Sequence, residues 1–152
     1  MREILFRGQL RRKCEKVNMA GEPLPSIWKY GGVSQIKPGG AVIYQTEPEI
    51  KKYPVYADTV GQYTGLMDKN GVKIFEGDIV QYTFDNPKET ITTENGLKIR
   101  YGRIFWSDWR GSWAVTVGNN CKINNDVYMY VRNGNRMQVV GNVYDNPELL
   151  ND

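Results

Sequence analysis

Residues Thr59–Val80 read TVGQYTGLMDKNGVKIFEGDIV and carry the strongest fold signal of the chain. Glycines at positions 61, 65, 71 and 77 interrupt it at short intervals, and apolar or aromatic residues stand between them. Frequent glycines between short apolar runs are typical of turn-rich β structure. Because the stretch is poor in reactive side chains, it predicts the path of a small β domain rather than any chemistry.

Within this stretch, Asn70-Gly71 is the clearest local signal. A type I′ turn needs positive φ at both central residues, and Asn-Gly adopts that conformation at low steric cost. Apolar residues flank the pair on both sides, so the pattern predicts a β-hairpin centred on it. Residues 80–84 then alternate between apolar and polar side chains, which predicts a half-buried strand.

The triplet Glu76-Gly77-Asp78 predicts a second sharp turn. Its two carboxylates allow two interpretations. They are either an acid–base or metal-binding pair, or turn residues that accept hydrogen bonds from nearby backbone N–H groups. We favour turn residues, because both acids flank a glycine in a turn.

Four segments of the chain resemble the YopX family of phage and prophage proteins. They are the central signature at Thr59–Val80, the opening strand at Ile4–Gly8, a Trp-x-Tyr-Gly element at Trp28–Gly32 and the closing motif at Gly141–Leu150. These segments follow the family's order, whereas residues 86–96 fit no part of its pattern and are expected to form a variable loop. The family has no established activity, so the resemblance implies a phage or prophage protein and transfers no catalytic residue.

Composition predicts a mainly β chain with minor α structure. The chain has 152 residues, of which 16 are glycine and 18 are aromatic, and a chain of this length buries about 70% of its unfolded surface. Short strands linked by tight turns between residues 72 and 144 predict an SH3-like small barrel in the C-terminal half. We therefore expect a β-rich N-terminal extension or subdomain at residues 1–58 and an SH3-like β-barrel domain at residues 59–152.

Four further expectations concern single elements. They are one helical turn at residues 47–52, a bulge at Gly102 within a strand at 99–106, a strand at 127–132 and a short helix at 147–150 capped by Asn146. Proline near the start predicts both helical pieces, and an isolated glycine within a strand suggests the bulge.

Positive charge is concentrated at the N-terminus. The formal charge of the chain is +3; residues 1–16 hold six basic and two acidic groups and carry +4, while the remaining residues carry −1. Arg7, Arg11, Arg12 and Lys13 are therefore candidate contacts for the phosphate backbone of a nucleic acid. The alternative is a solvated basic loop without such a partner.

The sequence holds little catalytic chemistry. Histidine is absent, which removes the commonest general base and every His-dependent nucleophile or zinc site. No phosphate-binding glycine loop is present, and no cofactor is expected. Asp78, Asp108, Asp126 and Asp145 leave a magnesium-dependent nuclease open, but we predict a protein that is not an enzyme.

The two cysteines, Cys14 and Cys121, are far apart in the sequence and form no metal-binding pair. Cys121 lacks a histidine that could activate it as a nucleophile, so it is expected to be a buried structural thiol. Free thiols are typical of a reducing compartment.

Residues 106–113 hold three tryptophans, one arginine and one aspartate around a predicted hairpin. Trp113 shares the alternation of Val115 and Val117 and is expected in the core, whereas Trp109 lies at the turn and is expected at the surface. Because Trp and Arg are frequent at binding hot spots, Trp109 and Arg110 are the candidate interface residues.

Two functional hypotheses follow. The first is a non-enzymatic phage accessory protein that forms homo-oligomers and binds an unidentified phage or host protein. The second is a nucleic-acid-binding module that uses the basic N-terminus and the barrel aromatics. No apolar run approaches the roughly 18 residues of a membrane helix and the N-terminus lacks an export signal, so we expect a cytoplasmic location in the bacterial host and no membrane partner.

Overall fold

The computed structural model describes residues 2–12, 19–22, 24–37, 40–132 and 134–151. Contacts divide the chain into two compact units, Met1–Tyr63 and Thr64–Asp152. Both units consist of antiparallel strands with short helical pieces, so the expected mainly β fold with minor α structure is confirmed. Among the described residues, no helix is long and apolar enough to cross a membrane.

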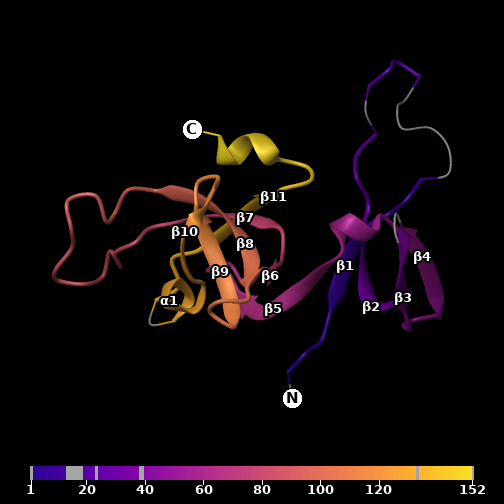
Figure 1. Ribbon diagram of the computed structural model, residues 1–152, viewed down its shortest axis with the longest axis horizontal. Helices are drawn as coiled ribbons and strands as arrows, with labels where there is room; N and C mark the ends of the chain where they lie inside the picture. Colours follow the sequence, from indigo (N-terminus) through magenta and orange to yellow (C-terminus); the bar gives the residue numbers. More distant parts are fainter. Residues whose placement is uncertain (1, 13–18, 23, 38–39, 133, 152) are drawn as a thin grey trace. The chain divides into compact units, whose positions relative to one another are not determined.

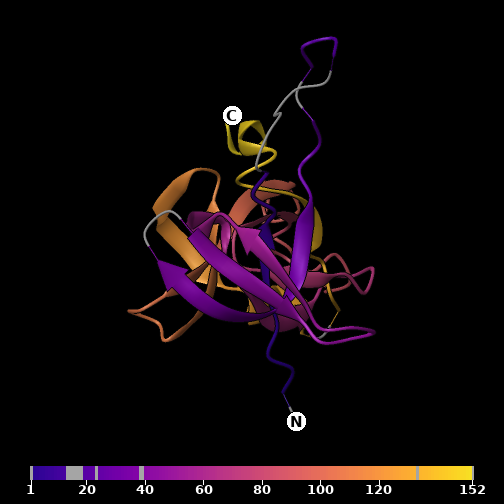
Figure 2. The same ribbon diagram turned by 90° about the vertical axis from the view of Figure 1, so that its right-hand side faces the viewer.

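The first unit is an antiparallel sheet with its strands in the order β4-β3-β2-β1-β5 (Figures 1 and 2). Its elements are β1 (Phe6–Gln9), β2 (Trp28–Lys37), β3 (Gly40–Gln45), β4 (Lys51–Val55), the 3₁₀ turn η1 (Ala57–Thr59) and the start of β5 (Gly61–Met67). Successive side chains of a strand point to opposite faces, so Ala41 and Ile43 of β3 are buried on one face together with Val55. These three residues form the centre of the first core.

The helical turn expected at residues 47–52 is wrong. Residues 51–55 form β4, which pairs with β3 so that Val55 lies opposite Ala41 and Tyr53 lies opposite Ile43. Val55 is fully buried in this register. Its burial outweighs the local preference of a proline for a first helical turn, because a single helical turn gains little stability by itself.

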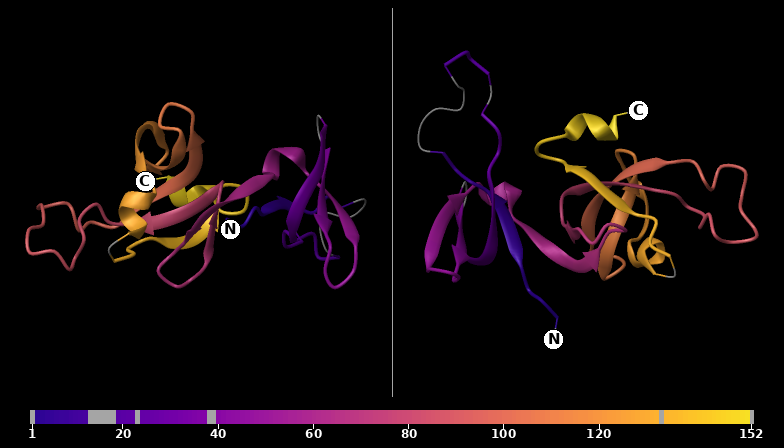
Figure 3. Two further views of the ribbon diagram at one scale, coloured as in Figure 1. Left: turned by 90° about the horizontal axis from the view of Figure 1, so that it is seen from below. Right: turned by 180° about the vertical axis from the view of Figure 1, so that it is seen from behind.

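The second unit is built on a five-stranded antiparallel sheet with the order β10-β9-β8-β7-β11. Its elements are β6 (Lys73–Phe75), which neighbours β5, and then β7 (Asp78–Tyr82), β8 (Arg100–Ser107), β9 (Ser112–Val117), β10 (Asn120–Asp126), α1 (Tyr128–Val131), β11 (Gln138–Asn142) and the 3₁₀ turn η2 (Pro147–Leu150). The sheet curls into a half-barrel (Figure 3), which confirms the small barrel expected in the C-terminal half. The connection from β7 to β8, which contains residues 86–96, is a long loop without helix or strand (Figure 3).

The core of the second unit gathers side chains from β6 to β9, from α1 and from the segments beside it. Its buried residues are Ile74, Val80, Tyr82, Ile104, Val115, Val127, Tyr130 and Met137. Two of them are tyrosines, and the ring centroids of Tyr82 and Tyr130 lie 4.7 Å apart. The Tyr82 hydroxyl donates a 2.8 Å hydrogen bond to the Thr116 carbonyl, which satisfies a polar group inside the core.

The hairpin expected at Asn70-Gly71 is confirmed, but its turn has another frame. The Gly71 N–H donates to the Asp68 carbonyl over 3.0 Å, so the central residues of the turn are Lys69 and Asn70. Gly71 follows with φ of +78°, as in a three-residue hairpin loop. The Asp68 carboxylate stabilises this frame because it accepts the N–H groups of Asn70 and Val72.

The strand expected at residues 127–132 is wrong, since this segment contains α1. Val127 and Tyr130, which are three residues apart, are both buried in the core, and that spacing matches one face of a helix. A strand would instead have placed Met129 on the same face as Val127, yet Met129 is 47% exposed. The β-branched and aromatic residues of this segment favour a strand locally. The joint burial of Val127 and Tyr130 outweighs this preference and stabilises the helix.

The short helix expected at residues 147–150 is confirmed as η2. Asn146 precedes it but makes no side-chain cap. Its Oδ1 atom instead accepts the backbone N–H of Asn142 over 3.2 Å, which ties η2 to the end of β11.

Gly102 does not mark a bulge. The register between β7 and β8 is continuous through this residue, which lies opposite Val80. A Cβ atom at position 102 would lie 2.0 Å from the Thr116 carbonyl oxygen and 2.8 Å from a Val115 methyl group. Glycine is therefore required for the close approach of two backbones in the curled sheet.

Candidate functional site: an aromatic and arginine surface on the half-barrel

The turn between β8 and β9 presents the most exposed tryptophan. Trp109 is 89% exposed, as its place at the turn predicts. Trp106 and Trp113 lie opposite each other in the register, with ring centroids 5.2 Å apart in an edge-on contact. Trp113 packs against the core, whereas Trp106 is 44% exposed. The hairpin therefore has a buried base and an aromatic tip.

Hydrogen bonds fix the shape of this tip. The N–H groups of Gly111 and Arg110 donate to the carbonyl and hydroxyl oxygens of Ser107 over 2.8 and 3.1 Å. The Arg110 guanidinium donates two 2.9 Å hydrogen bonds to Asn124 of β10, one to Oδ1 and one to the carbonyl oxygen. Its carbon lies 5.5 Å from the ring centroid of Trp109. Trp109 thus stands on a hairpin that is tied to the neighbouring strand.

All five arginines of the second unit lie against aromatic rings. From guanidinium carbon to ring centroid, the distances are 4.0 Å for Arg100 on Phe84, 5.0 Å for Arg136 on Tyr130, 5.5 Å for Arg110 on Trp109, 5.7 Å for Arg132 on Tyr128 and 5.9 Å for Arg103 on Phe105. Within the part of the chain that the structure describes, no carboxylate forms an ion pair with any of the five. Such pairs suit an anionic or aromatic partner, because a guanidinium group stacked on a ring can still donate N–H groups to it.

Tyr82 and Tyr130 lie beside these arginines and are neutral at pH 7. Burial raises the pKa of Tyr82 well above its ordinary value of 10.0; Tyr130 adds to the increase, and Arg100 opposes it. Burial also raises the pKa of Tyr130, against a hydrogen bond from Asn125 and the charges of three arginines. The tyrosines therefore contribute no negative charge to the arginine cluster.

These pKa shifts predict a loss of stability at alkaline pH. Tyrosines in the unfolded chain ionise near pH 10, whereas Tyr82 and Tyr130 ionise at higher pH in the folded chain. Their contribution is complete below pH 10 and is lost as the pH rises toward the folded pKa, because the unfolded state releases protons first. Tyr82→Phe should flatten this loss and cost about 1 kcal/mol at neutral pH through the hydrogen bond to Thr116. Urea unfolding between neutral and alkaline pH measures both effects; an unchanged alkaline slope in the variant would contradict the assignment.

Two of the candidate carboxylates, Asp78 and Asp126, accept hydrogen bonds within the fold. The Oδ2 atom of Asp78 accepts the Phe75 N–H over 2.7 Å, which confirms the turn interpretation for this residue. Asp126 accepts hydrogen bonds from the Ser112 hydroxyl and the Tyr128 N–H, each 2.8 Å long. Across the described residues, no group of three or more His, Cys, Asp or Glu side chains is placed to hold a metal ion.

Asp68 is a structural carboxylate that the sequence analysis did not identify. It is 4% exposed, and its oxygens accept the backbone N–H groups of Asn70, Val72 and Val139 over 2.8, 2.9 and 3.0 Å. An aspartate just before a predicted turn is a signal for such bonds. The local sequence gives no signal for the hydrogen bond to Val139 of β11, which is distant in the chain.

Three candidate arginines of the N-terminal segment, Arg7, Arg11 and Arg12, have different environments. Arg7 is 7% exposed, and its guanidinium carbon lies 4.8 Å from the ring centroid of Trp28. Arg11 is exposed, and Arg12 donates a hydrogen bond to a backbone carbonyl. Lys13 lies outside the described residues. Of these three arginines, Arg11 is therefore the most exposed to solvent.

The expectation of a buried thiol at Cys121 is wrong. Cys121 is exposed on β10, and its Sγ atom lies 3.0 Å from the Arg103 guanidinium. The polar asparagines of β10 leave this strand with little buried surface, as its burial pattern shows. Cys14 lies outside the described residues.

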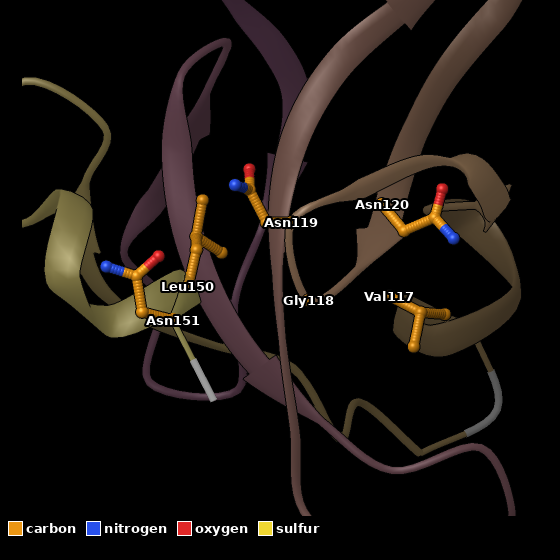
Figure 4. Close-up of a pocket in the computed structure, with 6 residues that line it drawn as sticks. All are labelled: Val117, Gly118, Asn119, Asn120, Leu150 and Asn151. Atoms are coloured by element: carbon orange, nitrogen blue, oxygen red, sulfur yellow. The ribbon is translucent and has the colours of Figure 1, made fainter.

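A hollow of about 530 Å³ opens beside the turn between β9 and β10 (Figure 4). Its lining comprises Val117–Asn120, Leu150 and Asn151, and the amides of Asn119 and Asn151 lie beside Leu150 in Figure 4. The described residues of this lining carry no ionisable side chain, and they offer the amides of three asparagines as hydrogen-bonding groups.

The fold and this surface define a β protein of two units, with a half-barrel that presents arginine–aromatic pairs. The YopX protein family matches residues 33–151, and the chain belongs to that family. A search of curated proteins finds no match. Among solved structures, protein EF1440 from Enterococcus faecalis is similar, with 22% sequence identity, a TM-score of 0.45, and coverage of 97% of this chain and 98% of that chain.

Proposed function

We propose that this YopX-family chain is a non-enzymatic accessory protein that self-associates through the β8–β9 hairpin. One observation carries the proposal: Trp109, 89% exposed, stands on a hairpin that Arg110 ties to β10. A large aromatic side chain held in place loses little entropy on binding, which is why tryptophan and arginine are common at interface hot spots. A protein of the phage or of the host, in the bacterial cytoplasm, would be the further partner.

The carboxylates support a binding role over catalysis. Asp68 and Asp78 are 4% and 1% exposed, and their oxygens already accept backbone N–H groups. A general acid or base must instead reach a proton of the substrate. These two acids are therefore better explained as parts of the fold.

Trp109→Ser should weaken self-association about 30-fold or more, because loss of a hot-spot tryptophan costs about 2 kcal/mol of binding energy or more. Light scattering over a series of protein concentrations measures the effect. Ile91→Ser is the matched control, since Ile91 is an apolar residue of the same unit and is 85% exposed. A wild-type chain that stays monomeric at all concentrations, or equal effects of the two variants, would rule out the proposal.

Nucleic-acid binding is the second candidate function. It is favoured by the arginine–aromatic pairs of the second unit and by the charge of the first unit, where ten basic and six acidic residues give +4. Guanidinium groups contact phosphates, and aromatic rings stack on bases. Titration with an oligonucleotide, described below for Arg100, distinguishes this candidate from self-association.

A further inference from the structure

Arg100, the first residue of β8, has an unusual environment. Its guanidinium carbon lies 4.0 Å from the ring centroid of Phe84, the shortest of the arginine–aromatic distances in the second unit. Its Nε atom is buried and has no hydrogen-bond partner among the described residues. Since buried polar groups are nearly always paired in native proteins, an unpaired donor of this kind requires an explanation.

A second arginine flanks the same phenylalanine. Arg136 donates 3.0 Å hydrogen bonds from Nε to the Thr83 carbonyl and from Nη2 to the Phe84 carbonyl. Arg100 stacks on the ring of Phe84, so the two guanidinium groups contact one residue from its side chain and from its backbone. Arg136 also lies 5.0 Å from the ring centroid of Tyr130. These contacts hold the two cations in fixed places near each other.

Asp85 interacts electrostatically with Arg136, but its carboxylate already accepts hydrogen bonds from the N–H and hydroxyl groups of Thr93. Tyr82 and Tyr130 are neutral at pH 7, and burial raises the pKa of each further above that pH. Arg100 itself pairs with no carboxylate of the described residues. Two cations that contact the same residue attract an anion where no carboxylate of the described residues forms an ion pair with them.

We propose that Arg100, beside Arg136, binds a phosphate group on the face of the half-barrel where β7 ends and β8 begins. A guanidinium plane presents paired N–H donors that match phosphate oxygens. Stacking on the Phe84 ring fixes the orientation of the Arg100 guanidinium before a phosphate binds. The phosphate comes either from inorganic phosphate or from a nucleic-acid backbone. This site goes beyond the proposed self-association and does not depend on it.

Side-chain NMR of the full chain tests the site directly. The Nε–Hε resonances of the arginines are followed in a ¹⁵N-labelled sample during addition of sodium phosphate, with sodium chloride at equal ionic strength as the control. We expect the Arg100 resonance to shift saturably with phosphate and to stay unchanged with chloride. An Arg100 resonance that does not respond to phosphate or to an oligonucleotide overturns the proposal.

An oligothymidylate titration separates the two phosphate sources. If the source is a nucleic acid, the Arg100 shift saturates at concentrations about tenfold lower or less than with inorganic phosphate, because neighbouring phosphates and bases add contacts. A response to inorganic phosphate alone supports the site and rejects the nucleic-acid candidate. Light scattering measures self-association in a separate experiment. Each proposal is therefore tested independently, and the failure of one does not affect the other.

Arg100→Lys keeps the charge and removes the planar fork, so phosphate affinity, followed in the variants by the Arg136 Nε–Hε resonance, should fall about fivefold or more. Arg103→Lys is the matched control, because Arg103 lies on the same strand over Phe105. Equal losses in both variants would show unspecific charge attraction and overturn the proposal. The amide spectrum of each variant reports whether it is folded, and the wild-type titration tests the site even if a variant is not.

Discussion

Gly102→Ala should lower the free energy of unfolding of the second unit by about 3 kcal/mol or more, at the upper end of the cost of overpacking a protein core. The added Cβ would lie 2.0 Å from the Thr116 carbonyl oxygen, and this neighbour is backbone rather than a flexible side chain. Relief requires β8 and β9 to separate where they pack Ile104 and Val115 into the core. Urea unfolding followed by tryptophan fluorescence measures the change.

Gly32→Ala provides the control for this substitution. A Cβ atom at Gly32 would meet nothing within 4 Å, so its cost should stay below about 1 kcal/mol, as is usual for a surface change. A Gly102→Ala variant as stable as the Gly32→Ala variant would show that the two strands are not held this close in solution.

Asp68→Ala should cost about 3 kcal/mol of stability. The variant leaves three backbone N–H groups, those of Asn70, Val72 and Val139, without their acceptor, and each lost hydrogen bond costs about 1 kcal/mol. The loss affects two places at once, because the carboxylate joins the β5–β6 turn to β11. Thermal or urea unfolding of the full chain provides the measurement.

Two companion variants sharpen the Asp68 experiment. Asp68→Asn keeps one acceptor oxygen of the same shape and should lose about half as much stability. Asp108→Ala removes an exposed acid of the β8–β9 turn and should change stability by less than about 0.5 kcal/mol. If Asp68→Ala were as mild as Asp108→Ala, the carboxylate would not be a structural acceptor.

The sequence predicts those parts of the fold that depend on near neighbours. Asn70-Gly71 predicts a hairpin because glycine adopts positive φ, and residues 80–84 predict a strand because their side chains alternate. The sequence does not predict the parts of the fold that depend on contacts between residues far apart in the chain. The turn frame follows from the Asp68 carboxylate, and the helix α1 follows from burial of Val127 with Tyr130 in a core that other strands complete.

The candidate surface was predictable to different degrees. Trp109 could be placed at the surface because a turn has no room to bury it. The Arg100 cluster could not be predicted, since Phe84, Arg100, Tyr130 and Arg136 lie on separate segments and meet only when the sheet curls. For Arg7, the sequence shows its charge but not its burial beside Trp28.

The strand order of the half-barrel has a consequence for how the chain folds. β7 to β10 follow one another both in sequence and across the sheet, whereas β11 returns to the far side of β7. Because pairing between distant segments costs more loop entropy, the β7–β10 meander should form early and β11 should dock late. During synthesis on the ribosome, β7 therefore has an unpaired edge until residues 138–142 have emerged. At this edge, a nascent chain can pair with a neighbouring copy and aggregate.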